Sequence, residues 1–282
     1  MRTYTVAAFT LLILLFHLPL PLPAAESQDT WRRRVSSESN DTIKEDIIEE
    51  VRFGREIAAR LIGRLGLYEN PRLMKYVNLV GHSLALNTNR PEIEFHFAVL
   101  NTNDINAYAA PGGYVFVTRG ALASMRTESE LAAVLAHEIT HISEKHVVKE
   151  LNIHGMEGSA ASGFARLIGG GTETARIAFY QAVDNALDIL FKTGYKREDE
   201  AHADKGAVLL CAVTGYDPSG LVKYFERIGA AGGKSTEVLD RTHPAYDARI
   251  AWLKDIIAKE GIDSGTLKNY RDRFFDVQKT LR

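Results

Sequence analysis

The stretch AVLAHEITHISEKH, residues 133–146, contains two histidines four residues apart, with a glutamate directly after the first. On a helix, residues four apart lie on one face, so His137 and His141 can direct ring nitrogens at one cation. Glu138 is rotated by about 100° from His137, which places its carboxylate beside that point, where it can take a proton from a water. The pattern indicates a metal site with a general base, against the alternative of unrelated polar residues on one helix.

The composition indicates a chain that folds around a large core. Its 282 residues are 45% hydrophobic, enough for one large domain or two small ones. The 34 basic and 36 acidic residues are interspersed, so we expect no nucleic-acid partner and no basic membrane-binding surface. The single cysteine, Cys211, cannot form an internal disulfide, and its apolar surroundings predict a buried, unreactive thiol.

Residues 1–25 have the pattern of a cleaved signal peptide. Arg2 precedes an apolar stretch from Val6 to Leu18, and small residues follow at Ala24 and Ala25. A membrane anchor is the alternative, but the apolar stretch is shorter than the roughly 20 residues a spanning helix needs. No cysteine near the predicted cleavage site could carry a lipid. We therefore expect an exported, periplasmic protein whose mature form does not span a membrane.

The remaining chain is expected to form a flexible leader, 26–40, and one domain, 41–282. The leader is polar without periodicity, and a capping box of Thr42 and Glu45 predicts the start of a helix that extends to about Leu65. Further helix starts are predicted from caps and apolar spacing, at Asn70–Pro71, Thr127, about Thr174, Glu198, Asp217–Pro218 and Ala245.

Two strands are predicted between the second and third helices. Apolar and polar residues alternate in EIEFHFAVLN, residues 92–101, which places His96 on a solvated face. A Pro-Gly-Gly turn at 111–113 leads into aromatic and branched residues from Tyr114 to Thr118. We therefore expect the α+β class, a mainly helical domain with a small antiparallel or mixed sheet.

A hydrolytic zinc site needs a third protein ligand. One known continuation is excluded because Glu144 and Val147 stand where it needs glycine and histidine. His146 would point off the shared face of a continuing helix, so we expect it at the surface. On the helix predicted in YKREDEAHADKGA, Glu200 and Asp204 share one face, so Glu200 could bind the metal and Asp204 could accept an N–H from a ligand histidine. A solvated acidic face is the alternative, and these residues alone leave both open.

Four signatures together resemble those of a known family. They are Asn106-Ala107 with Pro111-Gly112-Gly113, the motif from His137 to His141, Arg197 followed by Glu200 and Asp204, and His243-Pro244 followed by Arg249. Over roughly residues 47–257 the chain resembles the HtpX-like and CAAX-prenyl-endopeptidase-like zinc metallopeptidases, in particular the periplasmic branch of BepA-like and LoiP-like proteins. The resemblance implies a zincin-like fold.

The resemblance also implies roles for single residues. One Zn²⁺ would be held by His137, His141 and Glu200, with Glu138 as the base. His243 would lie near the metal, to stabilise the oxyanion or to cap the zinc, although a histidine before proline is by itself more often a plain loop residue. Supporting residues would be Asp204, Arg197 and Arg249. Lys196 stands where relatives usually have serine, which puts the hydrogen bonding around Arg197 in doubt.

These features predict a zinc metalloendopeptidase that acts on exported or envelope proteins. The predicted substrate-binding edge strand consists of Tyr114, Val115, Phe116 and Val117, with an ordinary core strand as the alternative. The glycine-rich residues 154–171 would form a lid. A chaperone-like or scaffolding envelope protein is the alternative function, but the residues after Arg249 are too few for the helical repeats such relatives add.

Overall fold

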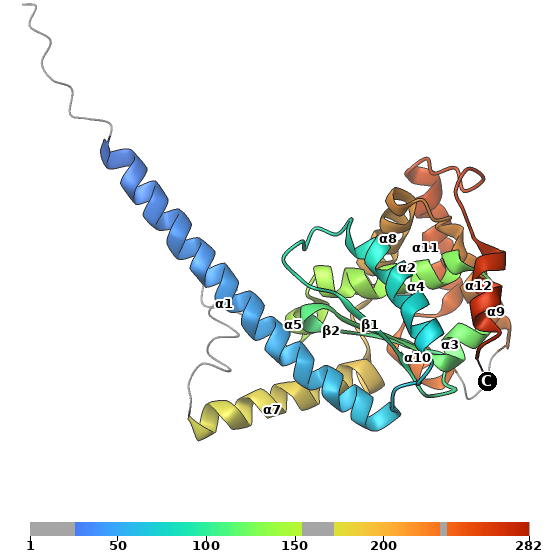
Figure 1. The fold of residues 1–282 in the computed structure, drawn as a ribbon, viewed down its shortest axis with the longest axis horizontal. Coiled ribbons are helices and arrows are strands. Elements are labelled where there is room, and N and C mark those ends of the chain that lie inside the picture. The colour runs from blue at the N-terminus through green and yellow to red at the C-terminus, as the bar shows by residue number, and fades with distance from the viewer. Residues whose placement is uncertain (1–25, 154–171, 232–235, 282) are drawn as a thin grey trace, which may run out of the picture. The chain divides into compact units, whose positions relative to one another are not determined.

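The computed structural model describes residues 26–153, 172–231 and 236–281 (Figure 1). The predicted signal peptide at 1–25 and the predicted lid at 154–171 lie outside these residues. By its contacts the chain divides into two units, residues 1–43 and 44–282. In the first unit the structure describes helical backbone from residue 26 to 43. Among the described helices, none combines the length and the apolar character needed to cross a bilayer.

The second unit is mainly helical with one small sheet, as predicted. The helices of the described chain are α1 (Glu26–Leu65), α2 (Pro71–Ala85), α3 (Arg119–Ser124), α4 (Glu128–Ser143), α5 (His146–Glu150), α7 (Glu173–Asp188), α8 (Arg197–Thr214), α9 (Ser219–Ala231), α10 (Glu237–Thr242), α11 (Tyr246–Lys259) and α12 (Arg271–Gln278). The strands are β1 (His96–Leu100), β2 (Ala107–Ala110) and β3 (Tyr114–Thr118), with short helical turns η1 (Pro111–Gly113) and η2 (Ile189–Thr193). The predicted α+β class is therefore confirmed.

Caps place the starts of α2 and α4 where the sequence predicts them. The Asn70 side chain accepts a hydrogen bond from the Leu73 amide, and Thr127 accepts one from the Glu130 amide. Helix α1 differs, because it begins at Glu26 and not at the predicted cap Thr42. No glycine or proline lies between these two residues, so nothing in the backbone forces a helix start at Thr42.

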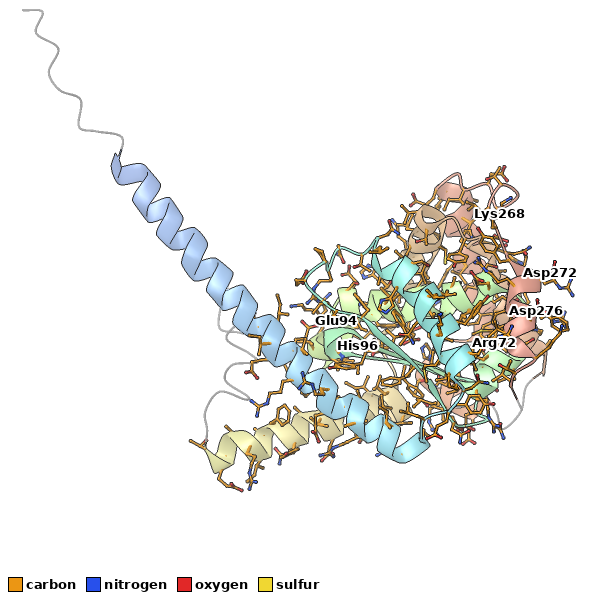
Figure 2. The ribbon with its side chains drawn as sticks, in the orientation of Figure 1. Arg72, Glu94, His96, Lys268, Asp272 and Asp276 are labelled. Carbon is orange, nitrogen blue, oxygen red and sulfur yellow. The ribbon has the colours of Figure 1, made fainter. Side chains whose placement is uncertain are left out.

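The sheet has the order β1-β3-β2, with β1 parallel and β2 antiparallel to β3. The predicted alternation is present, since Phe97 and Val99 are buried whereas Glu94 and His96 are exposed (Figure 2). The prediction of a substrate-binding edge strand is wrong. Tyr114, Val115, Phe116 and Val117 lie on the central strand β3, whose backbone pairs on both sides.

The Pro-Gly-Gly turn packs directly against α1. Gly112 and Gly113 have φ of 71° and 100°, a region that favours glycine. The Gly112 amide donates a hydrogen bond to the Glu50 carboxylate at 3.2 Å. A Cβ on Gly112 would lie 2.5 Å from the Val51 Cα. Only glycine therefore allows β2, η1 and β3 to fold back at this distance from α1.

Helix α4 runs through the core, and all of its residues from Glu128 to Ile142 are buried. It packs closely against α8, where Ala203 and Ala207 are buried and Gly206 faces Thr140. A Cβ on Gly206 would lie 2.4 Å from the Thr140 side chain, so the two helices approach as closely as glycine permits. This approach brings one turn of α8 beside the motif on α4.

Candidate active site

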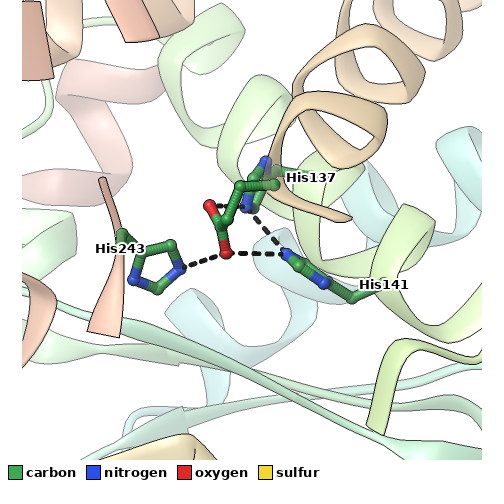
Figure 3. Close-up of side chains that lie close together, drawn as sticks. His137, His141 and His243 are labelled. Carbon is green, nitrogen blue, oxygen red and sulfur yellow. Dashed lines mark hydrogen bonds and ion pairs between the residues drawn. The ribbon is translucent and has the colours of Figure 1, made fainter. Parts of the chain in front are cut away.

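Four side chains from three segments meet between α4 and α8 (Figure 3). His137 and His141 extend from α4, Glu200 from the first turn of α8, and His243 from the residue after α10. The Nε2 atoms of His137 and His141 are 3.0 Å apart. One Glu200 oxygen lies 3.5 Å from the Nε2 atoms of both His141 and His243, and the other lies 3.7 Å from Nε2 of His137.

These separations fit one tetrahedral metal ion. Ligands at about 2.1 Å from a zinc lie about 3.4 Å from one another, because that is the edge of the tetrahedron they form. The Glu200 carboxylate is fully buried, and among the described residues neither of its oxygens has a hydrogen-bond partner. A buried carboxylate without such partners is costly unless a cation compensates it. Burial raises the pKa of Glu200 well above its usual range, so its ionised form needs a positive charge close by.

The buried charges around the group also call for a divalent cation. Glu138, Glu200 and Asp204 would contribute three negative charges when ionised, and Arg249 contributes one positive charge. Arg249 donates to Asp204 at 2.6 Å, whereas its nearest nitrogen to Glu200 is 3.7 Å away. With neutral imidazoles the difference is two negative charges. The donor set of imidazoles and carboxylate suits a metal of the zinc type.

Asp204 and Arg249 fix the orientation of His137. The Asp204 carboxylate lies 3.1 Å from Nδ1 of His137, close enough to accept its N–H and leave Nε2 without a proton. A guanidinium nitrogen of Arg249 lies 3.3 Å from this Nε2. Burial alone would raise the pKa of Asp204, but the guanidinium of Arg249 and hydrogen bonds from both partners lower it to about 2. Asp204 therefore remains a carboxylate at neutral pH. The sequence analysis proposed Asp204 as the acceptor of an N–H from a ligand histidine, but it did not predict the contact of Asp204 with Arg249.

His141 is held by two residues that the sequence analysis did not assign to the site. The Tyr195 ring stacks on the His141 ring with a centroid separation of 4.2 Å. Nδ1 of His146 lies 2.8 Å from Nδ1 of His141. The prediction that His146 is a surface residue is wrong, since its side chain is fully buried.

The error has a local cause, because the prediction extended α4 as a regular helix. The helix ends at Ser143, and Lys145 adopts a left-handed conformation with φ of 56°. An ion pair of Lys145 with Glu50, at 3.4 Å, accompanies this conformation. The chain therefore turns, and His146 begins α5 beside His141. A histidine shortly after the motif was the available signal, but helical geometry alone could not place it.

Glu138 and His243 border a cavity of about 30 Å³. Its wall also includes Ala107 from β2, Tyr224 from α9 and Leu239 from α10. A cavity of this size holds a water molecule or two but no peptide. Burial raises the pKa of Glu138 to about 8, with the positive charge of Arg249 opposing the shift. The Glu138 side chain is therefore almost fully buried beside this small cavity.

Not every predicted residue lies at this site. Arg197 is exposed, and its guanidinium lies over the Trp252 ring, 4.8 Å from the centroid. It is the first residue of α8, one turn before Glu200. The predicted unreactive thiol of Cys211 is buried as expected, and burial raises its pKa.

The family model of peptidase family M48 matches residues 71–257, about two thirds of the chain. The chain belongs to peptidase family M48. All four residues that meet between α4 and α8 lie within the matched range. The resemblance drawn from the motifs is therefore confirmed, and the M48 domain is the part of the chain that carries the candidate site.

Named relatives of this M48 domain are proteases. The beta-barrel assembly-enhancing protease of Escherichia coli is 28% identical over 213 residues, which cover 72% of this chain and 42% of that protein. The metalloprotease LoiP of Escherichia coli is 27% identical over 194 residues, covering 68% of this chain and 74% of that protein. Metalloprotease YcaL of the same organism is 27% identical over 174 residues. The chain thus spans less than half the length of the first of these relatives.

Proposed function

We propose that this chain is a zinc-dependent endopeptidase that hydrolyses peptide bonds of exported or envelope proteins. The observation that carries the proposal is the buried Glu200 carboxylate, whose two oxygens face three imidazoles and lack hydrogen-bond partners within the part of the chain that the structure describes. His137, His141 and Glu200 would hold the ion. When bound, zinc would supply Lewis-acid chemistry, polarising the scissile carbonyl and favouring ionisation of the attacking water near neutral pH.

Glu138 is the proposed general base and acid. It follows His137 on α4 and borders the same cavity, so its carboxylate can take a proton from the attacking water and return it to the leaving amine. A pKa of about 8 in the buried site suits a group that both accepts and donates a proton, and a neighbouring cation would lower it towards neutrality. Burial also keeps bulk water away from this proton.

His243 is proposed to cap the ion in the closed arrangement. Its Nε2 lies in the same ligand-sized group as the other imidazoles, and the Thr242 hydroxyl, 3.0 Å from Nδ1, fixes the ring. A catalytic zinc site keeps one position open for water, whereas four protein ligands close it. Cleavage would therefore require His243 to withdraw and the small cavity to open.

Strand β2 is the proposed docking edge for the peptide. Within the described residues β2 pairs only with β3, and Ala107 on β2 borders the cavity beside Glu138. An extended peptide can add to such an edge through backbone hydrogen bonds. Hydrogen exchange of a Glu138→Gln variant with a bound peptide should show new protection at Ala107–Ala110 and none at His96–Leu100. Protection at β1 alone would contradict this placement.

The proposed substrates follow from the start of the chain and from one relative. The first 25 residues have the pattern of an export signal, which supports a periplasmic location. The relative from Escherichia coli is named for enhancing beta-barrel assembly. Envelope proteins that fail to assemble expose extended segments, and an edge strand next to a metal site suits such segments.

The test is a Glu138→Gln variant in a casein digestion assay. It should retain bound zinc but lose about 100- to 10,000-fold in turnover, because general acid–base catalysis contributes a factor of this size. The control is Glu144→Gln at the end of α4, whose side chain is 42% exposed and should be dispensable. Wild-type turnover in Glu138→Gln would refute the assignment, and no zinc-dependent turnover in the wild type would favour the chaperone-like alternative.

A further inference from the structure

A second group of possible metal ligands lies directly behind His141. His146 uses Nδ1 to contact His141, and its other ring nitrogen, Nε2, is buried and has no hydrogen-bond partner in the described ranges 26–153, 172–231 and 236–281. Nε2 faces the start of α8, where the nearest Asp199 oxygen lies 3.5 Å away. A fully buried ring nitrogen without a partner is unusual, because desolvation costs free energy that a hydrogen bond or a metal normally offsets.

Asp199 and His202 complete this group. They lie three residues apart on α8 and so share one face of the helix. One ligand atom from each of His146, Asp199 and His202 lies within 4.8 Å of the others. Two imidazoles and one carboxylate are a donor set that zinc and other late first-row divalent ions prefer.

We propose that His146, Asp199 and His202 form a second divalent-cation site, separate from the one at Glu200. The distance of 3.5 Å between the His146 and Asp199 ligand atoms is close to the tetrahedral edge of about 3.4 Å for zinc. His202 is exposed, so its side chain is free to turn the remaining distance, and solvent can supply the ion and a fourth ligand.

The two sites are coupled through the contact between the two Nδ1 atoms. If His141 binds a metal through Nε2, its proton must be on Nδ1, and it donates that proton to Nδ1 of His146. His146 then carries its own proton on Nε2, where it cannot bind an ion. For His146 to bind through Nε2, the proton between the rings must belong to His146, and His141 is left protonated on Nε2.

An ion at the second site therefore opposes the ion at the first. Both imidazoles cannot present Nε2 to a metal while a normal hydrogen bond joins their Nδ1 atoms. Filling the second site must break the contact between the rings or weaken the hold of His141 on its metal. The second site thus acts as an inhibitory site that responds to excess divalent metal.

Metal counting tests the site without reference to catalysis. Purified full-length protein is dialysed against buffers of rising free Zn²⁺, and zinc per chain is measured by mass spectrometry. We expect the wild type to take up a second ion, and His202→Ala and Asp199→Asn to stop at one. His82→Ala, which removes another exposed histidine, is the control and should keep the second ion. A single ion in the wild type, or a second ion retained in both variants or lost in the control, would overturn the site.

An activity assay then tests whether an ion at the second site inhibits the first site. This part of the proposal rests on the proposed peptidase function, whereas the second site itself does not. Casein digestion by the wild type should fall at the zinc concentrations that add the second ion, whereas His202→Ala should retain its activity there. Undiminished wild-type activity with two ions bound would overturn the coupling. If no form of the protein digested casein, the proposed function would fail, but the metal counts would still decide the second site.

Discussion

Asp204 orients the proposed metal ligand His137 by contacting the ring nitrogen that does not face the metal site. It accepts two hydrogen bonds from Arg249 and lies 3.1 Å from Nδ1 of His137. Its charge strengthens His137 as a ligand and fixes the tautomer that leaves Nε2 free. Because Arg249 is almost fully buried, loss of the Asp204 charge would also leave a buried guanidinium poorly compensated.

We therefore predict that Asp204→Asn lowers zinc affinity by about 10- to 100-fold, the usual effect of losing a residue that orients a ligand. Competition with a chromophoric chelator measures the affinity. The matched control is Asp276→Asn on α12, an exposed aspartate whose ion pair with Lys279 should contribute little (Figure 2). Equal zinc affinity in the two variants would contradict the role of Asp204.

At the scale of elements, the close packing of α4 and α8 sets the distance between the histidines and Glu200. Gly206 on α8 packs directly against α4, and a Cβ there would meet the Thr140 Cγ2 and Oγ1 at 2.4 Å. Thr140 is a stiff β-branched residue, and it lies on α4 between the two motif histidines. A larger residue at position 206 must therefore move α8 away from α4, and Glu200 with it.

We predict that Gly206→Ala lowers the free energy of unfolding by about 1–3 kcal/mol, a usual cost of overpacking, and also weakens zinc binding. The control is Gly63→Ala on α1, where an added Cβ meets no atom of the described residues within 4 Å. Because alanine favours a helix over glycine, this control should be neutral or stabilising by up to about 1 kcal/mol. Urea unfolding of both variants, with and without chelator, makes the comparison. If the two variants had the same stability and the same zinc binding, the close approach of α4 and α8 would not determine the geometry of the site.

Helix caps and strand alternation, which depend on residues close in sequence, were predicted correctly. The caps at Asn70 and Thr127 and the alternation through Phe97 depend on neighbours in sequence, and the structure has them where expected. The order of strands depends on long-range pairing, which the residues of β3 do not encode by themselves. The position of His146 depends on a left-handed residue, Lys145, that has no glycine to announce it.

In the candidate site, too, some features follow from residues close in sequence and others depend on the tertiary fold. Spacing along one helix predicts that His137 and His141 share a face, and Glu200 and Asp204 likewise. The meeting of the two helices could not be obtained from spacing, and the choice of Glu200 came from family resemblance. Tyr195 has no local signal at all, because it contacts His141 only through the fold.

At the scale of the whole molecule, Glu128 joins distant parts of the second unit. Its fully buried carboxylate accepts hydrogen bonds from Tyr76 on α2, Tyr216 after α8 and Arg273 on α12. It is also the first residue of α4, where a negative charge is favourable. The same helix carries the His137–His141 motif at its other end. Glu128 therefore stabilises the packing around α4 without contacting the candidate site.

We predict that Glu128→Gln lowers the free energy of unfolding by about 1.5–3 kcal/mol, the range for hydrogen bonds to a charged group. Because three partners lose the charge but the side chain keeps its shape, the folded fraction should retain its zinc and its turnover. Glu237→Gln, with a side chain 70% exposed, serves as the control and should leave stability unchanged. Loss of zinc from folded Glu128→Gln would contradict the claim that Glu128 affects the stability of the fold but not the binding of zinc.

The most direct test of the account compares zinc binding by Glu200→Gln and Glu198→Gln. Both substitutions remove one carboxylate from the first turn of α8, but Glu200 is fully buried beside the histidines and Glu198 is exposed. Zinc affinity is measured for each by chelator competition. We predict that Glu198→Gln binds zinc as the wild type does and that Glu200→Gln loses its tightly bound ion. Wild-type affinity in Glu200→Gln would contradict the convergence of two imidazoles and this carboxylate on one metal.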